Sequence, residues 1–148
     1  MILGVTLEEL EKTDVIPAFS FFSECQLPGS FKIEAFLHNW RMLLKNNMGA
    51  MWKLVNDGKM VGAMGGLLAP DMNDGEIVAT EAFWYVMPEF RHSTGGLKML
   101  VYFEKWAKEM GAKRIVMGHL LTNLPNALPE YYKRRGYSPT EIFYVKQV

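Results

Sequence analysis

The feature that most constrains the fold is a pair of apolar runs, 52–55 and 60–68, separated by a short polar segment that contains Asp57-Gly58. An Asp-Gly pair between two such runs is typical of a tight hairpin turn, in which both central residues adopt positive φ angles. A third run, 77–87, is rich in β-branched and aromatic residues and predicts a long central strand. We therefore expect a sheet in which these three segments are strands.

Two helices are expected before the hairpin. Thr6 and Glu9 have the spacing of a capping box, so a helix should begin there, after a short strand at 2–5. Ser30 is expected to cap a second helix, which should end near 46–49. The apolar residues of this second helix fall on one face at helical spacing: Phe36, Leu37, Trp40, Leu43 and Leu44.

The second half of the chain alternates helices and strands. Helical spacing over 97–107 predicts a helix that Gly111 closes with a left-handed cap. A strand at 115–121, a short helix with Pro129 in its first turn and a last strand at 142–145 should follow. The predicted order is strand, two helices, three strands, helix, strand, helix, strand, which indicates a mixed α/β fold.

The composition is that of one globular domain. The 148 residues suit a single domain spanning 1–148, and no repeat, linker or low-complexity tract divides them. Cys25 is the single cysteine, which excludes a disulfide framework, and it shares no metal-ligand spacing with His38, His92 or His119. No apolar stretch is long enough to span a membrane and we find no signal peptide, so we expect a cytoplasmic protein without a metal or a membrane partner.

The charges are divided between two parts of the chain, although the formal net charge is zero. Residues 1–90 carry six basic and twelve acidic side chains, a balance of −6, whereas residues 91–148 carry ten and four, a balance of +6. One interpretation is that these charges are merely solvated; another is that the basic part faces an anionic ligand and the acidic part a cationic one. The basic cluster Lys133-Arg134-Arg135 is only weak support for a nucleic-acid partner in a neutral chain.

Residues 86–100 have the pattern of a strand that enters a turn of small residues and leaves it as a helix. The first N–H groups of a helix have no internal partner, and the helix dipole is positive at this end, so a phosphate group can bind there. The alternative is that the small residues serve only to pack the turn closely. The turn and its flanking charges comprise Arg91, Ser93, Thr94, Gly95, Gly96 and Lys98.

This segment resembles the cofactor-binding motif of the GNAT superfamily, the acyl-coenzyme A dependent N-acyltransferases. In that family a V-x-P-x-[YF] lead-in precedes Gln or Arg, two residues, Gly, one residue, and Gly or Ala. Arg91 matches the first position of the motif and Gly96 the last, whereas Thr94 stands where the first glycine is usual. The surroundings match at Val86, Pro88, Phe90 and Leu100.

The resemblance implies a mixed, mostly antiparallel central sheet with helices on both faces. It covers the order of elements over nearly the whole chain. A second patch agrees with it, since Tyr132 lies four residues before Gly136, which an aromatic residue, Tyr137, follows as in family members. Asn123 or Asn126 would correspond to the asparagine that contacts the pantetheine arm of the cofactor in the family.

The same resemblance implies acetyl-coenzyme A as the acetyl donor. Its pyrophosphate would lie on the backbone of the turn, and its pantetheine would run beside the end of the long strand like an additional strand. The amide N–H of Met87 would polarise the thioester carbonyl. The residues expected to bind the cofactor are Tyr85, Val86, Met87, Arg91, His92, Ser93, Thr94, Gly95, Gly96 and Leu97, together with Asn123 and Asn126.

Acetyl transfer also requires a proton donor for the departing thiolate and a route for the amine proton. Tyr132 is the expected donor, because a tyrosine hydroxyl titrates at about 10, near the basicity of a thiolate. Tyr131 is a rival for this role, and the alternative role of Tyr132 is to pack its ring in the core.

Glu81 lies near the position where some family members carry a glutamate that removes the amine proton through water. Strand alternation sends Thr80 and Glu81 to opposite faces, and the bulge that family members have in this strand shifts that parity, so its direction stays open. Exposure at a sheet edge would also explain an acid in this strand.

We therefore expect an N-acetyltransferase that moves an acetyl group from acetyl-coenzyme A to an amine by direct attack. The acceptor, a small molecule or a protein, is not identified; the charge argument favours a cationic one, held by Glu81 or Glu24. The alternative is a non-catalytic binding or structural protein that retains this fold, and a nucleic-acid binding module is a weaker third. Whether the base is Glu81 or a water chain stays open, as does formation of a homodimer.

Overall fold

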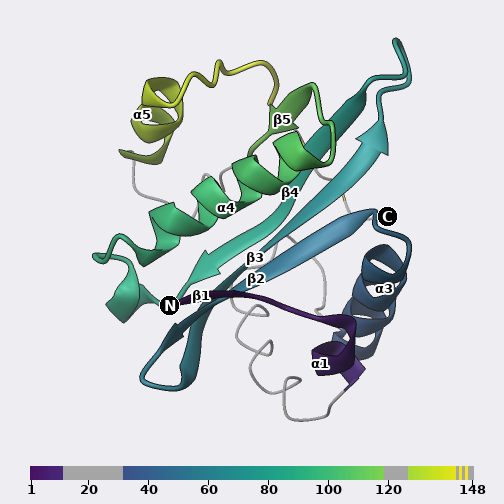
Figure 1. The fold of residues 1–148 in the computed structure, drawn as a ribbon. Helices are drawn as coiled ribbons and strands as arrows, with labels where there is room; N and C mark the ends of the chain where they lie inside the picture. Colours follow the sequence, from purple (N-terminus) through teal and green to yellow (C-terminus); the bar gives the residue numbers. More distant parts are fainter. Residues whose placement is uncertain (12–31, 119–126, 143, 145, 147–148) are drawn as a thin grey trace.

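The structure is a computed structural model that describes residues 1–11, 32–118, 127–142, 144 and 146 (Figure 1). Apart from the short 3-10 helix η3, the order of elements is the predicted one as far as residue 134. None of the described helices is both long and apolar enough to cross a bilayer. In chain order the elements are β1 (Ile2–Gly4), α1 (Leu7–Glu11), α3 (Ile33–Lys45), β2 (Gly49–Asn56), β3 (Lys59–Pro70), β4 (Ile77–Val86), η3 (Pro88–Phe90), α4 (Gly95–Glu109), β5 (Arg114–Val116) and α5 (Ala127–Arg134).

The strands form one five-stranded sheet in the order β1-β2-β3-β4-β5. Neighbouring strands are antiparallel from β1 to β4, whereas β5 runs parallel to β4. A parallel pair needs a crossover connection, and α4 provides it between β4 and β5. The prediction of a mixed α/β fold with a mostly antiparallel sheet is confirmed.

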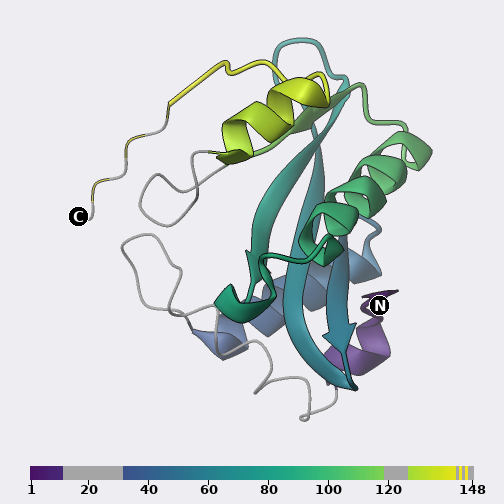
Figure 2. The ribbon, with the colours of Figure 1, turned by 90° about the vertical axis from the view of Figure 1, so that its left-hand side faces the viewer.

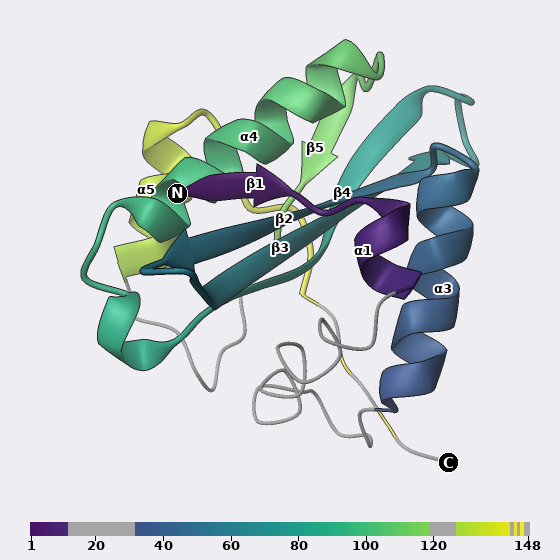
Figure 3. The ribbon, with the colours of Figure 1, turned by 60° about the horizontal axis from the view of Figure 1, so that its bottom comes forward.

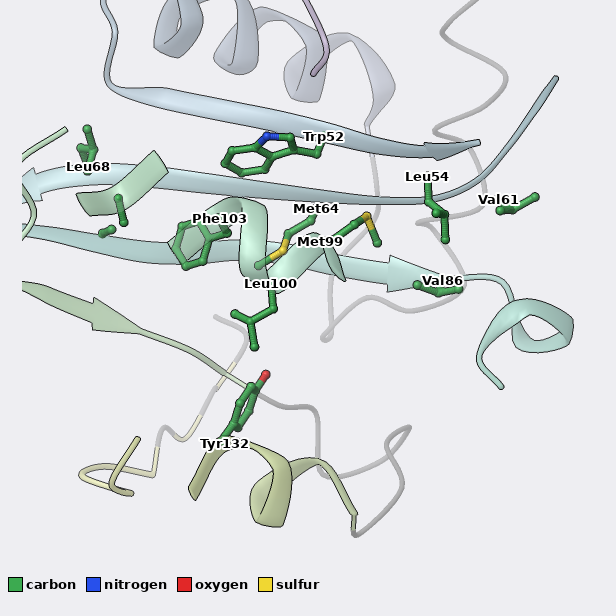
Figure 4. Close-up of a cluster of buried hydrophobic side chains, with 12 residues drawn as sticks. Trp52, Leu54, Val61, Met64, Leu68, Val86, Met99, Leu100, Phe103 and Tyr132 are labelled. Carbon is green, nitrogen blue, oxygen red and sulfur yellow. The ribbon is translucent and has the colours of Figure 1, made fainter. Parts of the chain in front are cut away.

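Helices cover both faces of the sheet (Figure 1, Figure 3). On one face, α3 buries Leu37 and Trp40 against Met51 and Tyr85, and α1 lies beside α3. On the other face, α4 and α5 cover the larger core (Figure 4). Its buried members are Trp52, Leu54, Val61, Met64, Leu68, Ala79, Val86, Met99, Leu100, Phe103, Ala107 and Tyr132.

The hairpin between β2 and β3 has the predicted turn. Asp57 and Gly58 have φ angles of 48° and 76°, both positive as a primed two-residue turn requires. Asn56 and Lys59 pair directly across this turn. The hairpin prediction is therefore confirmed, although both strands extend further than the apolar runs that revealed them.

The capping box at the first helix is also confirmed. The Thr6 N–H donates to Glu9 Oε2 at 2.9 Å, and the Glu9 N–H donates to Thr6 Oγ1 at 3.2 Å. These reciprocal bonds satisfy two N–H groups at the start of α1. The second helix, α3, begins at Ile33 with Lys32 in the N-cap position; Ser30, its predicted cap, lies outside the described residues.

The C-terminal elements differ in part from those expected. Gly111 has φ 80° and ends α4 as predicted, and α5 is the predicted short helix. β5 is shorter than the predicted strand 115–121, whose last three residues lie outside the described ones. Ile142 and Tyr144 are exposed and belong to no strand, while residues 143 and 145 of the predicted last strand lie outside the described part.

A bulge interrupts the pairing of β3 with β4. Glu81 pairs with Gly66, and Ala82 is the additional residue on β4 before regular pairing resumes. A Cβ atom on Gly66 would lie 2.4 Å from a ring carbon of Phe103 in α4, so this side of Gly66 faces α4. Because paired residues present their side chains to the same face, Glu81 points toward the face that α4 and α5 cover.

Candidate active site

The end of β4 has an edge with no strand neighbour among the described residues. β5 pairs with β4 only from Val78 to Thr80, whereas β3 accompanies β4 as far as Val86. Figure 2 shows the chain leaving β4, passing through η3 and turning back into α4. Beyond Thr80, the backbone of β4 therefore has no strand partner on the β5 side within the described part of the chain.

The backbone groups that face this open edge belong to Trp84 and Val86. The Met87 N–H donates to the Val61 carbonyl at 2.9 Å, so Met87 is directed toward β3. Residues of an antiparallel strand alternate between facing the partner and facing away, which turns Val86 and Trp84 to the open edge. The Nε of Arg91 accordingly reaches the Val86 carbonyl at 2.8 Å. The prediction that the Met87 amide polarises a thioester does not fit this structure, because β3 already uses that amide.

The turn into α4, which we call the phosphate turn (residues 91–97), leaves backbone N–H groups uncapped. Thr94 is the N-cap residue, yet its side chain makes no capping hydrogen bond. The first helical bond is from the Lys98 N–H to the Thr94 carbonyl at 3.0 Å. The N–H groups of Gly96 and Leu97 precede that bond and have no partner within the helix. They are therefore available to an anion.

Both glycines of the phosphate turn also pack closely on the sheet. A Cβ atom on Gly95 would lie 2.9 Å from Leu54 Cδ1, and one on Gly96 would lie 3.2 Å from Val86 Cγ2. The close-packing interpretation of these glycines therefore holds. Close packing is compatible with anion binding. Because the glycines carry no side chain toward the sheet, the start of α4 can lie directly against it, and the free N–H groups stay accessible.

Basic side chains flank the phosphate turn. The Arg91 guanidinium lies 5.5 Å from the ring centroid of Tyr85 and ties the turn to β4. Lys98 is exposed in the first turn of α4, which has no acidic residue. A cation at this end of the helix interacts unfavourably with the helix dipole, so Lys98 lowers the stability of α4 on its own. Its charge also favours binding of an anion nearby. His92, Ser93 and Thr94 are exposed beside it.

Glu81 is held at the open edge by a single backbone contact. The Gly118 N–H, just beyond β5, donates to Glu81 Oε2 at 3.2 Å. Burial raises the pKa of the Glu81 carboxyl to about 7, against the lowering effect of that hydrogen bond. Glu81 is thus only partly exposed at this sheet edge, and its carboxyl can exchange protons near neutral pH.

The Tyr132 side chain projects from α5 toward the sheet (Figure 4). Its side chain is 8% exposed, and its hydroxyl donates to the Gly118 carbonyl at 2.9 Å. Burial and the nearby Glu81 carboxylate raise the pKa of Tyr132 above the ordinary value that we assumed from the sequence. The phenol is thus protonated at neutral pH. Tyr131, its rival, instead has its ring 5.9 Å from the Arg135 guanidinium.

An ion pair that the sequence did not indicate fixes α5 on α4. Arg135 Nε donates to Glu104 Oε1 at 3.0 Å, and the Tyr137 hydroxyl donates to the same oxygen at 3.0 Å. Burial raises the pKa of Glu104, but the hydrogen bonds from Arg135 and Tyr137 outweigh it and leave the pKa lowered. The ring of Tyr137 also lies 5.6 Å from that of Tyr132, so these contacts help to orient the helix that carries Tyr132.

The structure thus brings together Glu81 and Tyr132, which we call the carboxylate–phenol pair, at Gly118. Gly118 had no signal in the sequence, because its role depends on where β5 ends. Asn123 and Asn126, the predicted contacts to pantetheine, lie outside the described residues, as does Glu24.

Two cavities among the described residues lie on the other flank of α4. One, of about 730 Å³, is lined by β1, β2 and α4, including Trp52 and Trp106. The other, of about 320 Å³, is lined in part by Thr94. Neither contains Glu81 or Tyr132 in its lining. Glu81 and Tyr132 therefore lie apart from these cavities, whereas Gly95 and Lys98 at the start of α4 also line the smaller one.

Comparisons with known proteins agree with this fold. The crystal structure of a ribosomal-protein-alanine N-acetyltransferase from Brucella melitensis biovar Abortus is similar with a TM-score of 0.70 and 15% identity, covering 100% of this chain and 99% of that one. AAC(6′)-Iy, in complex with the bisubstrate analogue CoA-S-monomethyl-acetylneamine, is similar with a TM-score of 0.73 and 18% identity, covering 100% of this chain and 98% of that one. A predicted acetyltransferase from Clostridium acetobutylicum, determined with acetyl-CoA, is similar with a TM-score of 0.74 and 14% identity, covering 99% of this chain and 95% of that one.

The sequence matches no curated protein. A model of the acetyltransferase (GNAT) family matches residues 15–137, which is most of the chain. That range includes the phosphate turn and the carboxylate–phenol pair. The chain therefore belongs to the GNAT acetyltransferase family.

Proposed function

We propose that this protein transfers an acetyl group from acetyl-coenzyme A to an amine by direct attack of the amine on the thioester. The observation that carries this proposal is the carboxylate–phenol pair, held on one residue, Gly118, at the open edge of β4. A base and an acid at one site are what the reaction requires. The GNAT family, to which the chain belongs, consists of acetyltransferases.

The described residues fit the cofactor. The uncapped N–H groups of Gly96 and Leu97, with Lys98 beside them, would hold the pyrophosphate. The backbone groups of Trp84 and the N–H of Val86 at the open edge would pair with the pantetheine arm in the manner of a strand, while Arg91 holds the Val86 carbonyl. When bound, coenzyme A supplies the activated acetyl thioester.

The carboxylate–phenol pair would move the protons of the reaction. Glu81, with a pKa raised to about 7, accepts the proton of the attacking amine through water. Tyr132, protonated at neutral pH, donates its proton to the departing sulfur. A new N–C bond replaces the C–S bond, and the two protons exchange through solvent afterwards. A water chain without Glu81 would carry the first step if the Glu81→Gln variant kept its activity.

The acceptor is an amine, and we propose a cationic one. Glu81 is the acidic group at the open edge, and AAC(6′)-Iy, a structural neighbour, is described with a neamine-bearing analogue. Three other acids of the first 90 residues form ion pairs, Glu9 with Lys53, and Asp71 and Asp74 with Arg114. The general charge asymmetry therefore counts for less than the local carboxylate.

A panel of amines with release of free thiol as the readout tests this function. Polyamines and lysine-like amines should be acetylated faster than neutral or acidic amines. This preference should weaken when the salt concentration is raised from about 0.05 to about 0.5 M, because salt screens the attraction between Glu81 and a cationic amine. Preference for an acidic amine would reject the cationic acceptor alone. Binding of coenzyme A without turnover of any amine would favour a non-catalytic binding protein.

A further inference from the structure

The indole N–H of Trp84 is a buried donor without an acceptor. Among the described residues, Trp84 Nε1 is the buried side-chain nitrogen or oxygen that has no hydrogen-bond partner. Buried donors in folded proteins are paired in the large majority of cases, and an orphan requires an explanation. A bound molecule could supply the acceptor that the described part of the chain does not provide.

Trp84 lies on the face of β4 where that molecule would pass. It pairs with Met64, a member of the core beneath α4, so its side chain faces α4 and α5. Two residues further along β4, Val86 lies under Gly96 of the phosphate turn. In the other direction, beyond the bulge, the same face carries the carboxylate–phenol pair. Trp84 is therefore between the phosphate turn and the proposed site of acetyl transfer.

We infer that the Trp84 indole N–H donates a hydrogen bond to a carbonyl oxygen of the pantetheine arm. This inference rests on the proposed function, because it requires coenzyme A at the open edge. An arm that joins a pyrophosphate at the phosphate turn to a sulfur at the carboxylate–phenol pair must run along the open edge of β4, beside the face that carries the Trp84 side chain. Pantetheine carries two amide carbonyls, and each is an acceptor that a buried indole N–H can use.

The consequence is selectivity for ligands that contain the arm. The turn binds phosphate groups by charge and backbone N–H groups, which adenine nucleotides in general can satisfy. The indole N–H of Trp84 can form its hydrogen bond only with a ligand that extends past the phosphate turn toward Glu81. It therefore acts as a positioning residue that fixes the register of the arm along β4.

The test is a binding comparison by calorimetry with two ligands, coenzyme A and adenosine 3′,5′-bisphosphate, which lacks the arm. Trp84→Phe keeps an aromatic ring and removes the N–H. It should weaken coenzyme A binding by roughly fivefold to tenfold, the value of one hydrogen bond. Binding of the bisphosphate should be unchanged. Trp52→Phe is the matched control, because Trp52 is buried on the same face but on β2, two strands away, and should leave both affinities unchanged.

Each result separates the inference from the proposed function. If the wild-type protein does not bind coenzyme A, the proposed function is overturned and the inference with it. If the wild type binds coenzyme A and Trp84→Phe binds it equally well, only the inference is overturned. Equal loss of both ligands in Trp84→Phe also overturns it, because the effect then does not depend on the arm.

Nuclear magnetic resonance provides the second measurement if Trp84→Phe does not fold. The chain has four tryptophans, so the indole N–H resonance of Trp84 can be assigned by elimination with Phe variants of the other three. Coenzyme A should shift this resonance downfield, as formation of a hydrogen bond does, and adenosine 3′,5′-bisphosphate should not. An indole N–H resonance of Trp84 whose chemical shift does not change with either ligand would contradict the inference.

Discussion

Glu81 and Tyr132 are bound to opposite sides of one residue: the Gly118 N–H donates to the Glu81 carboxylate at 3.2 Å, and the Gly118 carbonyl accepts from the Tyr132 hydroxyl at 2.9 Å. One position just beyond β5 therefore sets the spacing of the proposed base and acid. The Glu81 carboxylate also raises the pKa of Tyr132, which couples their protonation.

Glu81 should control the pH dependence of turnover. Its pKa is raised to about 7, so the carboxylate required of a base forms as the pH rises through that value. We expect kcat/KM to increase with pH with an apparent pKa of about 7. Glu81→Gln should lower kcat by about 10²-fold and remove this dependence, as expected for loss of a general base. Glu34→Gln, at an exposed position of α3, is the control and should retain the wild-type profile.

The same shift predicts a stability change of a definite sign. The pKa of Glu81 is 4.5 in its ordinary state and about 7 in the folded protein, so between these pH values the folded protein binds more protons at Glu81 than the unfolded chain does. Stability should therefore fall as the pH rises through this window. Glu81→Gln should stabilise the protein by about 1–3 kcal/mol at pH 8 and have little effect at pH 4.5. Urea unfolding at both pH values measures this; a destabilised variant at pH 8 would contradict the burial argument.

Tyr132→Phe should separate catalysis from binding. The variant loses the proposed proton donor but keeps the ring in the core, so kcat should fall by about 10² while coenzyme A affinity stays similar. Loss of the bond to Gly118 should cost about 1 kcal/mol of stability. Tyr131→Phe is the adjacent control. Retention of activity in Tyr132→Phe with loss in Tyr131→Phe would transfer the role to Tyr131.

Lys98→Glu should change stability and cofactor affinity in opposite directions. A negative charge in the first turn of α4 complements the helix dipole and should stabilise the free protein by about 0.3–1 kcal/mol. The same charge should repel a pyrophosphate on the phosphate turn and weaken coenzyme A binding about tenfold. Thermal unfolding with and without coenzyme A measures both. Lys105→Glu, two turns along α4, should not weaken binding; an equal loss there would point to general charge repulsion.

Glu104 should be essential for the position of α5. Glu104→Ala removes the acceptor of both Arg135 and Tyr137, and we expect a loss of about 1–2 kcal/mol because two hydrogen bonds to a half-buried carboxylate are lost. Activity should fall further than stability explains, since α5 carries Tyr132. Glu109→Ala removes an exposed ion pair with Lys105 on the same helix and should cost less than about 0.5 kcal/mol. Similar unfolding curves for the two variants would show that Glu104 is not an anchor.

Local interactions in the sequence determined most of the elements of this fold. The positive φ angles of Asp57-Gly58 and the capping bonds of Thr6 and Glu9 involve residues within four positions of one another, so their patterns can be recognised without tertiary contacts. The start of α4 at Gly95 likewise depends on neighbouring residues. For the same reason the segment that resembles the GNAT cofactor-binding motif could be recognised from the sequence alone.

Only the tertiary structure decided how the site is arranged. The bulge opposite Gly66 determines which face Glu81 occupies, and pairing with Val61 removes the Met87 amide from the open edge. The contacts of Gly118 with Glu81 and Tyr132 span 37 and 14 positions of the chain. Such contacts depend on strand register and on where a strand ends, and a shift of one residue would reverse every assignment. A pattern of residue types along the chain does not specify that register; packing of the two cores against the sheet does.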